Sequence, residues 1–178
     1  MRTSMFVTLS VLFVFLSGNS FSQNATSELP PEAKTRLDHR IGAWDIKMEF
    51  LDRNGEVRRT TSGKDTARYL IGDWVVELTT VMAGQGSTSK AWIFYNGQEG
   101  KFYLTSVDSG GDLWVLSGGL DEYVITSTPK PTRNGREMTI RFTHSNIQKD
   151  SFEAVMETSI DGGQSWWTRS RQYITRSK

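Results

Sequence analysis

Residues 42–51 read GAWDIKMEFL, and their polarity alternates at every position from Trp44 to Phe50. The apolar side chains fall on the even numbers from Trp44 to Phe50, and the charged side chains fall on the odd numbers between them. Successive side chains of a β-strand point to opposite faces, so this period of two indicates a strand with one buried and one solvated face. The segment therefore predicts a sheet that is covered on one side only.

Short segments of the same kind follow to the end of the chain, separated by glycine-rich turns. Asn-Gly pairs at 54–55, 96–97 and 134–135 favour tight hairpins, because both residues accept the positive backbone φ angles that such turns need. We place the strands at 42–51, 64–70, 74–82, 90–95, 101–107, 112–117, 121–128, 137–145, 151–160 and 166–176.

Tight sequential hairpins favour an all-β fold whose neighbouring strands are antiparallel and run up and down. A long sheet has two exposed edges unless it closes, so we predict a single antiparallel up-and-down β-barrel of about ten strands. A two-layer sandwich is the structural alternative. Only residues 31–40 are compatible with a helix, which would be short and would cover one end of the barrel.

The N-terminus has the layout of a cleaved secretory signal: Arg2, an apolar run at 5–16, and small polar residues at 17–22. The apolar run is shorter than the roughly 20 residues that cross a bilayer, so we expect no membrane span. We expect a secreted or periplasmic protein. Its expected parts are a signal peptide at 1–22, a flexible lead-in at 23–36 and the barrel at 37–178.

Composition narrows the possible chemistry. The chain has no cysteine, which excludes disulfides, thiolate metal ligands and cysteine nucleophiles. Its 21 Lys and Arg residues balance 20 Asp and Glu residues, which argues against a nucleic-acid-binding protein. No nucleophile elbow, phosphate-binding loop or metal-ligand spacing occurs, so we expect a monomer without enzyme activity, metal or cofactor.

Several short motifs carry a resemblance to known proteins. Residues 42–44, GAW, with an arginine near the chain's end, resemble the signature of the calycin superfamily, which includes lipocalins and fatty-acid-binding proteins. A closer resemblance spans 37–178. The segments RYLIGDWVVE at 68–77 and IFYN at 93–96, the turn that contains Asp121 and the terminal YITR at 173–176 look like an uncharacterised family of secreted bacterial calycin-like proteins. This resemblance implies a lipocalin-like barrel and no particular function.

The calycin resemblance also implies a plug at one end of the barrel. In that superfamily the tryptophan fills the end and an arginine lies across its ring, a cation–π contact worth about 1 to 2 kcal/mol. Here the plug would consist of Gly42, Trp44 and Arg176. Arg171 has the opposite parity on the last strand, and antiparallel closure favours Arg176 as the partner of Trp44.

The aromatic side chains are too numerous to lie on one surface, so many must point into the barrel. The interior is then either filled or contains an apolar pocket, and the sequence leaves both open. The leading hypothesis is a non-enzymatic protein that binds a small apolar or aromatic molecule in a cavity of several hundred cubic ångströms. The predicted ligand-binding residues are Trp44, Trp92, Phe94, Phe102, Met138, Ile140, Phe142 and His144.

Two alternatives remain at this point. His144 continues the face of Met138, Ile140 and Phe142, and the nitrobindins, another calycin-like group, hold haem in a ten-stranded barrel through one histidine. A nitrobindin-like barrel with His144 as haem ligand is therefore the first alternative. The second is a filled barrel that acts as an interaction module through exposed aromatic residues such as Trp166 and Trp167.

Overall fold

The computed structural model describes residues 28–178, apart from 85 and 133. The expected signal peptide at 1–22 and the start of the expected lead-in lie outside the described residues. The elements, in chain order, are α1 (Pro31–Arg40), β1 (Gly42–Leu51), β2 (Val57–Ile71), β3 (Val75–Met82), β4 (Thr88–Asn96), β5 (Lys101–Asp108), β6 (Leu113–Gly119), β7 (Val124–Ser127), β8 (Lys130–Pro131), β9 (Glu137–Gln148), β10 (Ser151–Ser159) and β11 (Trp167–Arg176).

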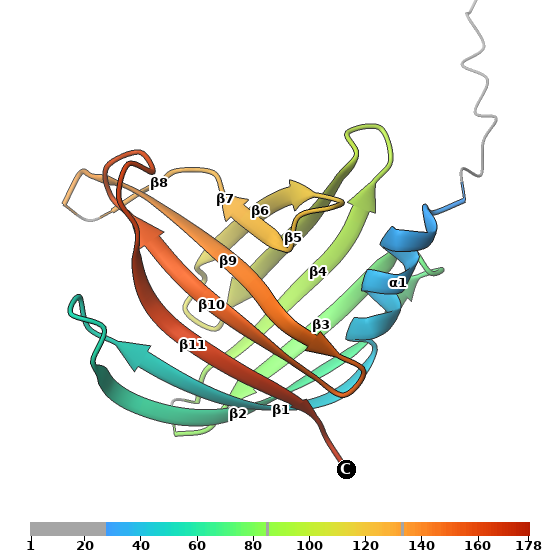
Figure 1. The fold of residues 1–178 in the computed structure, drawn as a ribbon, viewed down its shortest axis with the longest axis horizontal. Helices are drawn as coiled ribbons and strands as arrows, with labels where there is room; N and C mark the ends of the chain where they lie inside the picture. The colour runs from blue at the N-terminus through green and yellow to red at the C-terminus, as the bar shows by residue number, and fades with distance from the viewer. Residues whose placement is uncertain (1–27, 85, 133) are drawn as a thin grey trace, which may run out of the picture.

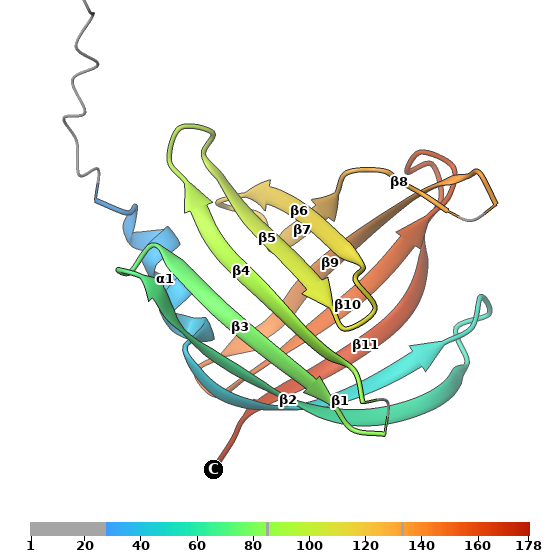
Figure 2. The same cartoon turned by 180° about the vertical axis from the view of Figure 1, so that it is seen from behind.

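The strands form a closed antiparallel barrel (Figures 1 and 2). Each strand from β1 to β6 pairs with the next, β7 pairs with β9, β9 with β10, and β10 with β11. Pairing of β11 with β1 closes the cylinder, and β8 is a two-residue addition to β9. The prediction of an up-and-down barrel of about ten strands is therefore confirmed, and the two-layer sandwich does not form.

The strand positions agree with the sequence pattern except in β2. This strand begins at Val57, seven residues before the predicted start at 64. Its first half is polar and exposed, so the pattern carries no alternation there. Pairing extends it nevertheless, because residues 46–51 of β1 hydrogen-bond with 57–63 across the hairpin.

In two of the three Asn-Gly turns the glycine has the expected positive φ, but the asparagine before it does not. Gly55 and Gly135 have φ angles of +84° and +73°. Gly97 does not have a positive φ, because the chain makes a longer turn at 97–100 in which Gly100 adopts φ +66°. The chain reverses direction at the predicted place with a different turn.

Helix α1 lies across one end of the barrel (Figure 1). Pro31 occupies its first turn, where the missing N–H has no intrahelical acceptor to lose. Ala33 and Leu37, four residues apart on one face, are fully buried against Val76, Leu78 and other core residues. The expected short helix at 31–40 is therefore present. Residues 31–36, which were expected to belong to the flexible lead-in, are part of this helix.

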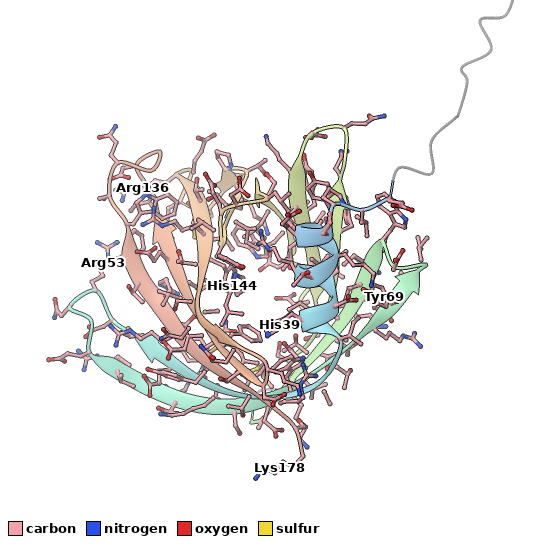
Figure 3. The ribbon with its side chains drawn as sticks, turned by 45° about the vertical axis from the view of Figure 1, so that its right-hand side comes forward. His39, Arg53, Tyr69, Arg136, His144 and Lys178 are labelled. Carbon is pink, nitrogen blue, oxygen red and sulfur yellow. The ribbon has the colours of Figure 1, made fainter. Side chains whose placement is uncertain are left out.

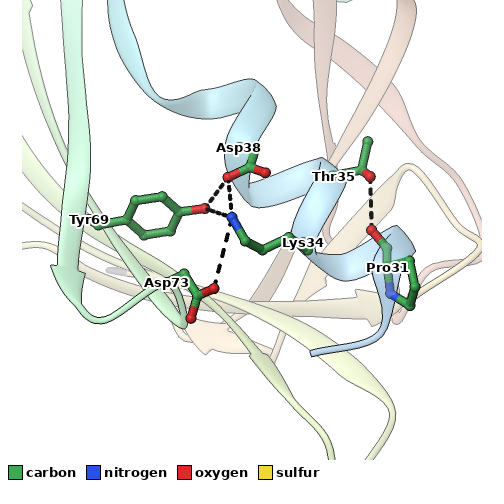
Figure 4. A network of polar contacts seen from close by, with 6 residues as sticks. All are labelled: Pro31, Lys34, Thr35, Asp38, Tyr69 and Asp73. Atoms are coloured by element: carbon green, nitrogen blue, oxygen red, sulfur yellow. Dashed lines mark hydrogen bonds and ion pairs between the residues drawn. The ribbon is translucent and has the colours of Figure 1, made fainter. Parts of the chain in front are cut away.

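Polar contacts fix the outer side of α1 to the β2–β3 hairpin (Figure 4). Lys34 Nζ lies 2.6 Å from Asp38 Oδ1 and donates to the Tyr69 hydroxyl at 3.2 Å, and the same hydroxyl donates to Asp38. Lys34 Nζ also lies 3.9 Å from Asp73 Oδ2.

Within the described part of the chain, no helix is long and apolar enough to cross a membrane.

The predicted plug is present next to the helix. Trp44 is fully buried, and its Nε1 donates to the Arg40 carbonyl at 2.9 Å. Trp44 faces Arg176 in the β1–β11 register, and the Arg176 guanidinium lies 4.1 Å from the indole. Arg176 rather than Arg171 therefore covers the ring. A Cβ on Gly42 would lie 2.6 Å from Arg176 Nη1, and Gly42 has φ +121°, so this position requires glycine.

Candidate functional site: a cavity beneath the helix

A cavity of about 170 Å³ lies between α1 and the inner face of the barrel. Strands β4, β5, β7, β9 and β10 form its other walls. Its apolar lining consists of Leu37, Ile93, Phe102, Leu104, Ile125, Ile147 and Phe152. Its polar lining residues are Thr35, Arg36, His39, Arg40, Tyr103, Tyr123 and His144, of which Tyr103 directs its ring to the outer face, where it stacks on Phe94.

Aromatic rings separate the cavity from the plug. Phe152 lines the cavity, and its ring lies 5.3 Å from the Trp44 ring in an edge-on arrangement. His39 lies 5.4 Å from Trp44 and 5.6 Å from Phe152. Such tilted arrangements are favourable for aromatic pairs, and they give the cavity a rigid floor.

Arg36 joins the helix to the β6–β7 loop and forms part of the cavity wall. Its Nη1 donates to the carbonyls of Gly119, Leu120 and Glu122 at 3.2, 2.9 and 3.1 Å. Its guanidinium lies 4.2 Å from the Phe102 ring and 4.9 Å from the Tyr123 ring. Burial lowers the pKa of this side chain, but an arginine remains charged at neutral pH.

Arg40 is buried beside Asp65 of β2. Its Nη2 lies 3.3 Å from Asp65 Oδ2, and its guanidinium lies 4.7 Å from the Phe152 ring. Burial raises the pKa of Asp65, and the nearby Arg40 charge opposes that rise. Arg40 Nε and Asp65 Oδ1 are both buried without a hydrogen-bond partner. The pair is therefore held together inside the barrel with part of its hydrogen-bonding capacity unused.

The two histidines lie in the space between α1 and strands β9 and β10 (Figure 3). His39 Nε2 donates to the Gln148 carbonyl at 2.7 Å, which anchors the end of the helix to the β9–β10 turn. The ring of His144 makes a tilted contact with Phe152, with the centroids 5.9 Å apart. Burial, reinforced by the charges of Arg40 and Arg36, lowers the pKa of His144 to about 4, so its imidazole is neutral at pH 7.

Six of the eight predicted ligand-binding residues divide into three groups on the inner side of the barrel. Phe102 and His144 line the cavity. Met138, Ile140 and Phe142 share the inner face of β9 but pack with Leu116 and Ile125 in a separate cluster. Trp44 belongs to the plug.

The placement of Trp92 and Phe94 inside the barrel was wrong. The inner face of β4 carries Ala91 and Tyr95, which are buried in the core cluster, so Trp92 and Phe94 lie on the outer face. Phe94 stacks there on Tyr103, with the ring centroids 5.4 Å apart. Aromatic character alone does not show burial, because in this strand the period of two decides which side chains point inward.

Sequence reasoning missed the contribution of α1. Arg36, His39 and Arg40 reach the cavity only because the helix lies across the barrel end. The spacing of the buried Ala33 and Leu37 would have shown which helix face is inward, and Arg40, three residues after Leu37, lies near that face.

The residues around the cavity do not form a metal site. Among the residues that the structure describes, no group of three or more His, Cys, Asp or Glu side chains could hold a metal ion. Haem also does not fit. His144 faces the cavity, but a four-pyrrole macrocycle is far larger than a space of about 170 Å³.

Trp166 and Trp167, expected to be exposed on an interaction surface, lie at the β10–β11 hairpin and are half-buried. Arg141 covers Trp166 at 4.2 Å from its ring, and Arg53 covers Trp167 at 4.8 Å. Ser159 and Asp161 hold the turn through bonds to the backbone of Gly163 and Ser165. Because arginines cover both indoles, this hairpin does not present the contiguous apolar patch that the alternative requires.

Comparison with known families identifies the chain. Residues 30–174 match the model of the family described as "Protein of unknown function (DUF1579)". The chain belongs to this family. Since the match covers the helix and all of the barrel as far as Ile174, α1 is part of the family's domain.

Solved structures share the fold at low sequence identity. The crystal structure of Rv2717c from M. tuberculosis is 11% identical, with a TM-score of 0.56 over 85% of this chain and 100% of that chain. The S-type phycobiliprotein lyase CPES from Guillardia theta is 8% identical, with a TM-score of 0.50 over 82% of this chain and 92% of that chain. A comparison with curated proteins found no match. These likenesses support the barrel fold alone.

Proposed function

We propose that this protein is a non-enzymatic binding protein, secreted or periplasmic, that holds a small apolar or aromatic molecule in the cavity beneath α1. The observation that carries the proposal is the cavity of about 170 Å³, which is walled mainly by aliphatic and aromatic side chains. Protein interiors are close-packed, so a space of this size between otherwise packed elements is unusual. Binding sites for small molecules are typically apolar concavities with a few polar groups.

The volume limits the size of the ligand. An apolar cavity of about 150 Å³ is large enough to hold benzene. The cavity here is of that size and smaller than the several hundred cubic ångströms expected from the sequence. The ligand is therefore a single ring or a compact aliphatic group, with contacts to Phe102, Leu104 and Phe152.

Helix α1 is the most easily displaced part of the cavity wall. It contributes Leu37 to the cavity, and it is held to the barrel by side-chain contacts from Lys34, Arg36 and His39. The strands on the other sides are joined by continuous backbone pairing. Separating the helix breaks a few side-chain contacts, whereas parting two strands breaks a ladder of hydrogen bonds.

The test is a titration with toluene, followed by the backbone amide resonances of the isotope-labelled protein. We expect saturable shifts that are centred on Leu104, Ile125 and Phe152. Leu104→Phe fills the cavity and should abolish them, whereas Leu113→Phe, at an exposed position on the next strand, should leave them unchanged. The proposal fails if toluene causes no shifts, or if Leu104→Phe leaves them as they were.

Secretion has a separate test. The N-terminal pattern at 1–22 supports it. Fractionation of the producing cells, with N-terminal sequencing of the mature protein, should find the protein outside the cytoplasm and starting near Gln23. A full-length cytoplasmic protein would contradict this part of the proposal.

A further inference from the structure

The charges around the cavity are all of one sign. The titratable residues that line it are Arg36, His39, Arg40, His144 and two tyrosines, and no aspartate or glutamate is among them. The chain as a whole is nearly neutral, with 21 basic and 20 acidic residues. The concentration of basic groups at this one apolar cavity is therefore a local feature and does not follow from composition.

The two arginines differ in how their charges are balanced. Arg40 pairs with Asp65 at 3.3 Å. Arg36 has no carboxylate within ion-pair distance among the described residues, and all three of its hydrogen bonds go from Nη1 to neutral backbone carbonyls. Its Nε and Nη2 find no acceptor in the described part of the chain. Arg36 thus brings an uncompensated positive charge to the cavity wall.

The position of Arg36 makes this charge available to a ligand. Its guanidinium is half-buried between the rings of Phe102 and Tyr123, both of which line the cavity. Nη1 is held by the β6–β7 loop, so the planar group has a fixed orientation. The Nε and Nη2 edge of a guanidinium matches the two oxygens of a carboxylate, and a charged pair is stronger where water is partly excluded.

The state of His144 agrees with a positive potential in the cavity. Arg40, Arg36 and His39 each disfavour a proton on its imidazole, in addition to the larger effect of burial. The same potential that repels a proton from His144 attracts an anion.

We propose that the ligand of this cavity is a small monocarboxylic acid, with its ring or compact aliphatic chain against Phe102, Leu104 and Phe152 and its carboxylate on the Nε and Nη2 edge of Arg36. This inference rests on the proposed function and specifies its ligand class. Helix α1 then supplies both an apolar wall residue, Leu37, and the carboxylate partner, Arg36.

The test compares phenylacetate with its neutral isostere phenylacetamide by isothermal titration calorimetry at pH 7 and low salt. We expect phenylacetate to bind at least tenfold more tightly than the amide. In Arg36→Met the two affinities should become equal within about twofold, while Lys34→Met should retain the preference. Both variants remove a polar contact that holds α1, but Lys34 does not line the cavity. The comparison therefore separates loss of the carboxylate partner from loosening of the helix.

A measurement on the unmodified protein covers the case in which Arg36→Met does not fold. The ¹⁵Nε resonance of Arg36 should shift on addition of phenylacetate and remain unchanged with phenylacetamide. Equal affinity for the two compounds, or binding of toluene without binding of phenylacetate, would overturn the carboxylate proposal and leave the apolar site intact. If toluene, phenylacetate and phenylacetamide all fail to bind, the proposed function fails as well.

Discussion

The plug around Trp44 and the cavity beneath α1 share a wall of aromatic rings, but they are built differently. In the plug, the Trp44 indole is fully buried, its N–H has an acceptor, and Arg176 donates to the Ile41 carbonyl at 2.9 Å and to Asp150 at 3.0 Å. In the cavity, the rings leave space, and one edge of the Arg36 guanidinium has no acceptor among the described residues.

The difference indicates that the plug and the cavity have different roles at the same end of the barrel. A closely packed region with satisfied polar groups contributes stability, because any removed atom leaves a hole. A hollow region with unsatisfied basic groups contributes little stability by itself and has capacity for a ligand. The predictions below change one region while the other serves as reference.

The largest effect should follow removal of the plug's central ring. We expect Trp44→Ala to lower the free energy of unfolding by about 3 to 5 kcal/mol, because the substitution leaves a large buried cavity. Trp92→Ala is the matched control, since Trp92 lies on the outer face of β4, and it should cost about 1 kcal/mol or less. Urea denaturation measures both. Similar losses in the two variants would contradict the assignment of Trp44 as the plug.

The cavity should make stability depend on pH through His144. The unfolded imidazole titrates near 6.5 and the folded one near 4, so the unfolded chain binds more protons between these values. Stability should therefore fall by up to about 3 kcal/mol as the pH drops from 6.5 to 4. His144→Gln should remove this part of the decline. The same slope in wild type and variant over that range would show that His144 is not the group responsible.

A comparison of Arg176 with Arg171 tests which arginine covers the Trp44 ring. Arg176→Met removes the cation over the Trp44 ring and should destabilise the protein by about 1 to 2 kcal/mol. Arg171 is exposed and has the opposite parity on β11, so Arg171→Met should change stability by less than about 0.5 kcal/mol. Thermal unfolding of the two variants measures both losses of stability. A larger loss in Arg171→Met than in Arg176→Met would reject the assignment of Arg176.

The smallest effect should come from filling the cavity. Leu104→Phe places extra volume in empty space and should alter the free energy of unfolding by less than about 1 kcal/mol. Leu116, its partner across the β5–β6 ladder, is almost fully buried in packed surroundings. Leu116→Phe should therefore cost about 1 to 3 kcal/mol through overpacking. Equal costs in chemical denaturation would mean that no usable space exists beside Leu104.

The fold was predictable to a large extent because its determinants are local. Alternating polarity gave the strands, turn residues gave the reversals, and the parity of Arg176 gave its place beside Trp44. The first half of β2 was missed because a polar hairpin arm shows no alternation, and its partner strand decides its structure.

The candidate site was less predictable because it depends on contacts between distant segments. Phe102 and His144 were identified by type and face, whereas Arg36 and Arg40 reach the cavity only after α1 docks on the barrel. Trp92 shows that residue type alone misleads when it conflicts with strand parity. The volume of the cavity follows from how side chains interlock, which no local pattern encodes.

A crystal structure of the protein grown in the presence of toluene tests the central claim most directly. The account predicts density for one ring beneath α1, in contact with Phe102, Leu104 and Phe152. A ring bound elsewhere, or side chains that close the space beneath the helix, would contradict it.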